Sequence, residues 1–260
     1  MVSPFVALTI GVDLDTDEHD NYIALGRQIK KARERLVNDH GFPRGKNFFS
    51  QMKKKSVTRA AGIEIGKYNS ALVKRKALLS SAEEKRALVD NLAPIISYSR
   101  GAIVYCGDIK SAGEINEAIC SESDITSSAY HSQIPADDQR HIMEGFRKQD
   151  IKCLVAVDML DEGVDIPHAD LAIILSSTQQ KRQLIQRLGR ILRKKDGQRG
   201  SVLTLCYANG TSEDPYHPSN DSGMVKISQL ELAREVIRLT PNKIQPRRIV
   251  KQIQQQICWG

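Results

Sequence analysis

From Gly101 onward the sequence alternates short β-rich runs with helix-length segments, and this alternation constrains the fold more than any other feature. The pattern predicts strands at 102–106, 125–130, 152–157, 171–175 and 201–207, with helices at 111–120, 135–148 and 180–193. Short apolar strands separated by helices indicate a doubly wound α/β fold, in which helices cover both faces of a parallel sheet. Ligands of such sheets bind at the carboxyl ends of the strands.

The first 98 residues do not read as a self-sufficient domain. Residues 4–14 alternate as a strand does, and a helix is expected from Asp17 to about Leu36. A second helical stretch should run from 68 to 92, where Pro94 would end it. We interpret this part as one strand and a helical connector.

Beyond Ala208, turn-forming residues predict a loop, followed by amphipathic docking helices at 227–239 and 244–257. The expected organisation is therefore a strand and connector over 1–98, an α/β domain over 99–210, and a loop with terminal helices over 211–260.

Composition excludes several classes of protein. No apolar run approaches the roughly 20 residues of a membrane helix, and the first 12 residues do not resemble a signal peptide. The five cysteines are widely spaced, as free thiols in a reducing compartment would be, and neither a Cys-x-x-Cys pair nor a His cluster offers a metal site. We expect a cytoplasmic protein without a metal centre of its own.

Positive charge gathers near the front of the chain. The whole sequence carries a net +7, and residues 27–86 alone hold 17 Lys and Arg against 5 Asp and Glu. Such a stretch fits an anionic partner such as nucleic acid, and it equally fits a solvated basic helix face.

The segment 179–195 (QQKRQLIQRLGRILRKK) has a distinctive polar stripe. Helical spacing places Gln186, Arg190 and Arg193 on one side and apolar residues on the other. Guanidinium groups suit bidentate contact with phosphate oxygens. A solvated basic face is the alternative, but Gly189 in mid-helix suggests that another group approaches the backbone closely.

A loop with functional features follows the strand that ends at Val157. Gly163 permits close approach of a ligand to the main chain, and Asp165 can accept hydrogen bonds from a ribose or an arginine. An acidic surface turn is the alternative. The pair Asp161 and Glu162 superficially suggests a magnesium site, but no phosphate loop accompanies it, so we reject that role.

Together these segments resemble superfamily 2 helicases and translocases. VAVDMLDEGVDIP and QRLGRILR resemble motifs V and VI, IVYC at 103–106 resembles motif IV, and residues 129–147 resemble the stretch between IV and V. The resemblance covers about 99–208, the second RecA-like domain. Residues 4–22 are more weakly similar to the exit from the first RecA-like domain in the branch of type III restriction subunits and excision-repair helicases.

The resemblance implies roles for individual residues around ATP. Arg190 and Arg193 match the arginine fingers that reach the γ-phosphate, and Gln186 matches the polar residue near the attacking water. Gly163 and Asp165 match motif V positions that line the nucleotide cleft, and Arg187 would form ion pairs that orient the motif.

The same resemblance implies a nucleic-acid track along the sheet edge. The matching positions are Gly107, Lys110, Ser132 and Met159, although Asp108 beside them has the wrong charge for a phosphate contact.

The sequence also departs from a complete helicase. It has no Gly-x-x-x-x-Gly-Lys-Ser/Thr phosphate loop. ATP and Mg²⁺ should then be held mainly by a missing first RecA-like domain, and the isolated chain is predicted to be inactive.

The leading hypothesis is the C-terminal half of an ATP-dependent helicase or translocase. DNA is favoured over RNA because QRLGRILR lacks the ending typical of DEAD-box RNA helicases. The alternative is a non-catalytic module that binds nucleic acid or docks a partner through residues 27–86. A small-molecule enzyme is disfavoured, since His131 and Ser132 are neighbours on a strand and cannot form a dyad.

Overall fold

A computed structural model describes residues 5–45, 47–53, 58–122, 124–157, 168–175, 201–217, 230 and 233–240. The chain divides into two compact units. One combines residues 1–13 with 80–260 and is called the sheet unit below. The other, residues 14–79, is called the helical unit.

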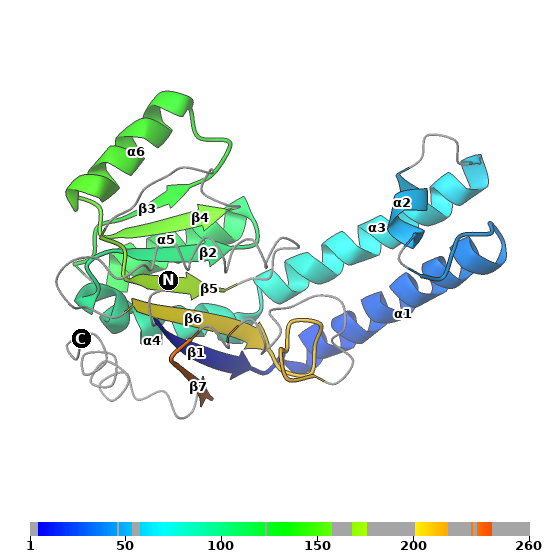
Figure 1. Cartoon of the computed structure of the whole chain (residues 1–260), viewed down its shortest axis with the longest axis horizontal. Helices are drawn as coiled ribbons and strands as arrows, with labels where there is room; N and C mark the ends of the chain where they lie inside the picture. The colour runs from blue at the N-terminus through cyan, green and yellow to red at the C-terminus, as the bar shows by residue number, and fades with distance from the viewer. Residues whose placement is uncertain are drawn as a thin grey trace. The chain divides into compact units, whose positions relative to one another are not determined.

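The sheet unit is built on seven parallel strands (Figure 1). Their spatial order is β3-β4-β2-β5-β6-β1-β7, and every observed pairing is parallel. The strands are β1 (Phe5–Val12), β2 (Ala102–Cys106), β3 (Ser127–Tyr130), β4 (Cys153–Val157), β5 (Leu171–Ile174), β6 (Ser201–Ala208) and β7 (Glu235–Leu239). The predicted parallel α/β fold is confirmed.

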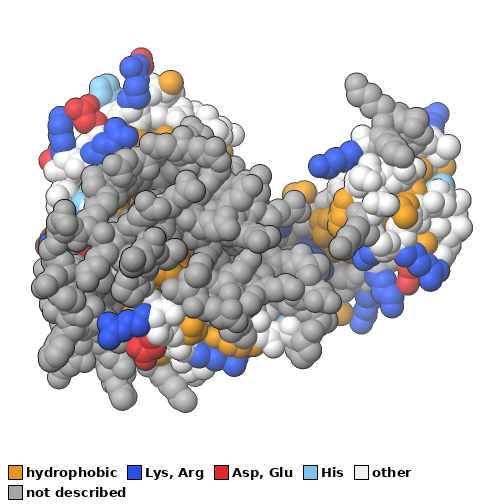
Figure 2. Space-filling model, in the orientation of Figure 1, with side chains coloured by type: hydrophobic (Ala, Val, Ile, Leu, Met, Phe, Trp, Pro, Cys, Tyr) orange, Lys and Arg blue, Asp and Glu red, His pale blue; other side chains and the backbone are white. Residues whose placement is uncertain are grey.

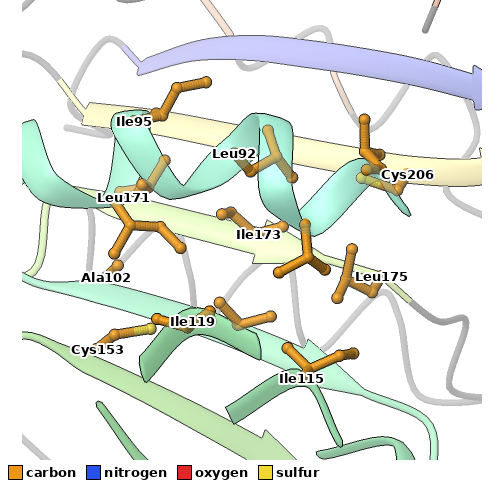
Figure 3. Packing of buried hydrophobic residues seen from close by; sticks show 14 of the residues in the cluster. Leu92, Ile95, Ala102, Ile115, Ile119, Cys153, Leu171, Ile173, Leu175 and Cys206 are labelled. Carbon is orange, nitrogen blue, oxygen red and sulfur yellow. The ribbon is translucent and has the colours of Figure 1, made fainter. Parts of the chain in front are cut away.

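Helices cover both faces of this sheet. Helices α4 (Glu83–Tyr98) and α5 (Ile109–Glu122) pack on one face, where side chains such as Leu92 and Ile119 meet Val104 and its neighbours. Figure 3 shows Leu92 and Ile95 of α4 and Ile115 and Ile119 of α5 directed at the strands. Helix α6 (Ala136–Lys148) packs on the other face through Phe146. The five inner strands, β1, β2, β4, β5 and β6, alternate their side chains between these two apolar layers.

The position of β1 differs from the sequence-based expectation. Residues 4–14 were expected to leave a missing first domain, yet β1 lies inside this sheet between β6 and β7. All eight of its residues are buried, and Phe5 pairs with Ser201. The division expected at residue 98 therefore does not follow the compact units, since β1 and α4 both belong to the sheet unit.

Two helix predictions are wrong. The stretch 68–92 belongs to two helices, α3 (Arg59–Ser80) and α4, and Pro94 lies within α4. A proline removes one hydrogen bond from a helix, and the packing of Ile95 and Ile96 on the sheet compensates for that loss. The segment 227–239 was expected to be a docking helix, but its last five residues form β7, which pairs with the edge of β1.

The helical unit has its own small core. It contains α1 (Thr16–Asn38), the short α2 (Phe48–Met52) and α3. A capping box starts α1, because Glu18 N–H donates to Asp15 Oδ1 and Asp15 N–H donates to Glu18 Oε2. The Phe48 ring contacts Phe42 and Tyr68, with centroids 5.9 and 5.7 Å away. The connector predicted from sequence is thus a packed helical unit.

The described ranges contain no helix with the length and apolar character needed to cross a bilayer. Within the same ranges, no group of three or more His, Cys, Asp or Glu side chains is arranged to hold a metal ion.

The four described thiols of the sheet unit should differ sharply in reactivity. Burial raises the pKa of Cys153 and Cys206 to about 12 and also raises that of Cys106, whereas Cys120 is exposed. Since the thiolate is the reactive form, iodoacetamide at pH 8 should label Cys120 in the native protein. The three buried thiols should react only after denaturation, as peptide mass spectrometry would show. Rapid native labelling of Cys153 would contradict this packing.

Candidate nucleotide and nucleic-acid site

The carboxyl ends of the parallel strands meet at one edge of the sheet. Gly107 and Lys110 follow β2 at this edge, and Ser132 follows β3. Strand β4 lies between β2 and β3, so the two connections are two strand spacings apart, roughly 10 Å. The structure thus brings the three described track residues to the same edge of the sheet.

Asp108 directly precedes helix α5 and caps its first turn. Its Oδ1 accepts a hydrogen bond from Ser111 N–H and its Oδ2 one from the Ser111 hydroxyl, both at 2.9 Å. A carboxylate at this position satisfies otherwise unpaired N–H groups and complements the positive end of the helix dipole. This capping role explains an acidic residue at an edge where a phosphate contact would need a donor.

Lys110 is the one cation among the predicted track residues that the structure describes. Its side chain is 87 % exposed, and its Nζ lies 3.8 Å from Glu114 Oε1. The other carboxylate oxygen, Glu114 Oε2, lies 3.5 Å from Arg86 Nη2. Ion pairs this exposed contribute little stability. The ammonium group can therefore exchange this carboxylate for another anion at low cost.

Ser132 lies in a hydrogen-bonded turn that follows β3. Ile134 N–H donates to His131 O at 3.1 Å, and the Gln139 side-chain amide donates to Ile134 O at 2.7 Å. Ser132 itself is exposed. The turn holds its hydroxyl group at the sheet edge without burying it.

Three segments distant in sequence converge where β1 and β6 end. The Asn209 side-chain amide donates to Asp13 Oδ1 at 2.8 Å, and Asp13 N–H donates to Glu84 Oε2 at 2.9 Å. A Cβ atom on Gly11 would lie 2.2 Å from Asn209 Oδ1, so any larger residue there would require the Asn209 side chain to move. Sequence reasoning missed this cluster, although an aspartate directly after a buried strand is a signal that could have indicated it.

A buried ion pair fastens the segment after β6 to the start of α4. Lys85 Nζ donates to Glu213 Oε2, and the two residues are only 1 % and 3 % exposed. The sequence signal was present, because Lys85 shares the apolar face of α4 with Leu88 and Leu92. A lysine on that face requires a buried partner.

The other predicted site residues lie outside the described residues. These are Gly163, Asp165 and Met159 from the first loop, and Gln186, Arg187, Arg190 and Arg193 from the second segment. Their convergence stays a prediction. Described strands flank both segments: β4 ends at Val157, β5 is followed by Leu175, and β6 begins at Ser201.

Solved structures identify the class of fold. The C-terminal part of the Fun30 ATPase domain superposes with a TM-score of 0.51 at 11 % identity, covering 97 % of each chain. S. cerevisiae Dbp5 bound to RNA and ADP BeF3 superposes with a TM-score of 0.50 at 13 % identity, covering 97 % of this chain and 82 % of that one. The sheet is that of a RecA-like domain.

The family follows from the sequence comparisons. Residues 84–195 match the family model for the helicase conserved C-terminal domain. These residues therefore belong to the C-terminal domain family of superfamily 2 helicases.

Curated relatives match over limited segments. The DNA 3'-5' translocase XPB2 of Sulfurisphaera tokodaii is 43 % identical over 77 residues, which is 30 % of this chain. UvrABC system protein B of Pseudothermotoga lettingae is 24 % identical over 175 residues, or 65 % of the chain, and the DEAD-box ATP-dependent RNA helicase 3A of Zea mays is 29 % identical over 118 residues, or 45 %. The aligned segments cover 17, 25 and 16 % of these relatives, so the chain spans a quarter or less of their length.

The buried ion pair gives a direct test of this part of the structure. We expect Glu213→Leu alone to lower the free energy of unfolding by about 3–5 kcal/mol, because it leaves a buried charge unpaired. The double variant Lys85→Met/Glu213→Leu should recover most of that loss, as urea denaturation would measure. A double variant as unstable as Glu213→Leu, or less stable, would show that the pair does not form.

Proposed function

We propose that the chain is the C-terminal half of an ATP-dependent DNA helicase or translocase. The observation that carries this proposal is the match of residues 84–195 to the helicase C-terminal domain, on a RecA-like sheet. No segment of the 260 residues has the spacing of a phosphate loop. A first RecA-like domain would therefore hold ATP, and this chain would complete the site when the two domains close.

The residues of this chain fit the role of phosphate ligands better than that of metal ligands. Arg190 and Arg193 offer fixed, planar sets of donors for the γ-phosphate. At the described part of the edge, by contrast, the carboxylates of Asp13 and Asp108 accept hydrogen bonds from the protein itself. Mg²⁺, which neutralises phosphate charge when bound, would thus be held mainly by the first domain.

The remaining motif residues would support these two arginines. Gln186 would orient the attacking water, Gly163 and Asp165 would line the cleft, and Arg187 would form the ion pairs that orient the motif. Each arginine would stabilise the negative charge that develops on the transferred phosphoryl group. Closure of the two domains would remove water from both guanidinium groups and align them with that phosphate.

Nucleic acid would run along the same edge. Gly107, Lys110, Ser132 and Met159 are proposed to contact the sugar-phosphate backbone, which carries no base information. DNA is supported by the QRLGRILR segment and by the 43 % identity to a relative named as a DNA translocase. RNA is the competing ligand, since a DEAD-box RNA helicase also matches.

The cellular setting is part of the same proposal. Cys106, Cys153 and Cys206 are free thiols buried in the sheet unit. Free thiols persist in reducing compartments, which supports a cytoplasmic location.

Loss of either arginine finger should sharply reduce the ATPase rate. With a P-loop domain supplied, the chain should hydrolyse ATP in response to DNA, and Arg190→Ala or Arg193→Ala should lower the ATPase rate by about 10³–10⁵-fold. The chain alone should show no hydrolysis.

Arg140→Ala is the matched control, because Arg140 is an exposed arginine on α6 that pairs only with Asp137 in the described structure. Its rate should stay near that of the unmodified protein. Near-normal turnover in both finger variants would refute the proposed roles, and stimulation by RNA alone would refute the choice of DNA.

A further inference from the structure

The charge of the chain is segregated between its two units. The helical unit carries 15 Lys and Arg against 7 Asp and Glu, a net of +8, whereas the remaining residues carry 23 against 24. Four of those seven acidic residues lie within 15–20, around the start of α1. Figure 2 shows clusters of Lys and Arg side chains on the described surface of the helical unit. The positive charge of the whole protein is therefore a property of this unit.

One side of the helical unit gathers cations from both long helices. Arg35 of α1 and Lys67 of α3 both contact Glu64 Oε1, at 3.3 and 2.7 Å. Helical spacing extends this side along each helix, with Lys31 and Arg27 one and two turns before Arg35, and Lys74 two turns after Lys67. We call these five residues the basic strip: Arg27, Lys31, Arg35, Lys67 and Lys74.

The basic strip has too few counter-ions of its own. Glu64 is its single ion-pair partner among the described residues, and the hydrogen bond from Lys67 chiefly lowers the pKa of that carboxyl, so it stays ionised. The nearest acidic positions along α1 are Asp20, Glu34 and Asp39, and none of them forms an ion pair with a strip residue in the described structure. Arg27, Lys31 and Lys74 therefore have no ion-pair partner among the described residues.

The strip is also accessible. The side chains of Arg35 and Lys67 are 43 % and 56 % exposed, and Arg27, Lys31 and Lys74 are exposed. Eight residues separate Arg27 from Arg35, which spans about 12 Å of helix. Like charges at one-turn spacing destabilise a helix, and a bound polyanion would relieve that repulsion.

We propose that the basic strip binds the sugar-phosphate backbone of DNA, as a second contact separate from the sheet edge. The inference rests on the proposed function only in taking nucleic acid as the ligand. Lys and Arg side chains on a helix surface contact phosphates without reading bases, so the strip adds affinity and footprint but no sequence preference. Each neutralised phosphate releases counterions and makes the binding depend on salt.

The helical unit supplies a matched control for the test. Lys31→Gln/Lys74→Gln removes two strip charges, while Lys30→Gln/Lys76→Gln removes two exposed charges that lie about 100° and 160° around the same helices from Lys31 and Lys74. Glutamine preserves helix propensity. Both variants are made in the full chain, and fluorescence anisotropy follows binding to a labelled 20-base-pair DNA duplex without ATP, between 50 and 200 mM KCl.

The strip variant should flatten the plot of log affinity against log salt by about 1.8, because each phosphate that the protein no longer neutralises reduces the slope by about 0.9. The control variant should leave the slope within error of the unmodified chain. Equal flattening in both variants, or in neither, overturns the proposal. Absence of DNA binding at 50 mM KCl also overturns it and would assign the strip to an acidic protein partner.

This result is independent of the motor proposal. If the Arg190 and Arg193 variants keep normal ATPase rates while the strip variant flattens the salt dependence as expected, the motor mechanism fails and the basic strip stands.

Discussion

Every main feature of the sheet unit depends on one constraint: parallel strands cannot be joined by tight hairpins. Each connection must cross the sheet, and the helices that make these crossings bury both of its faces. Because both faces are buried, the neighbouring residues Ile103 and Val104 are both apolar and point into different apolar layers. Because the strands all run one way, their carboxyl ends share an edge, and Gly107 and Ser132 lie there for this reason.

Local pattern was sufficient to predict the strands and helices between residues 101 and 208 that the structure describes. The predicted strands agree with β2 to β6 to within about two residues, because short apolar runs bounded by turn formers have few alternatives. The sequence pattern did not predict the places of β1 and β7, because these depend on pairing between strands that are distant in sequence. Phe5 pairs with Ser201 across most of the chain, and no local signal indicates such a partner. Residues 235–239 have apolar spacing that also fits a helix, but the open edge of β1 selects a strand.

In the candidate site too, local sequence motifs predicted some positions, whereas contacts between distant segments could not be predicted. Motif order placed Gly107, Lys110 and Ser132 after strands that end at one edge of the sheet, and the structure has them there. The acidic residue at Asp108 is explained by its hydrogen bonds to Ser111. The pair of Lys85 and Glu213 could not be predicted as a pair, because 128 residues separate them. A charged residue on an apolar helix face nevertheless marks a position where a buried partner must exist.

Asp13 is the last residue before the helical unit, and its N–H donates a hydrogen bond to Glu84 of α4, the helix that follows the unit. We call this junction the seam. A chain that leaves a sheet and returns to it at one seam places little demand on the length or shape of the inserted part. The sheet can keep its strand order and its core while this insertion is exchanged for another. For a protein engineer, the seam is a natural position at which to graft a different recognition module onto an unchanged sheet.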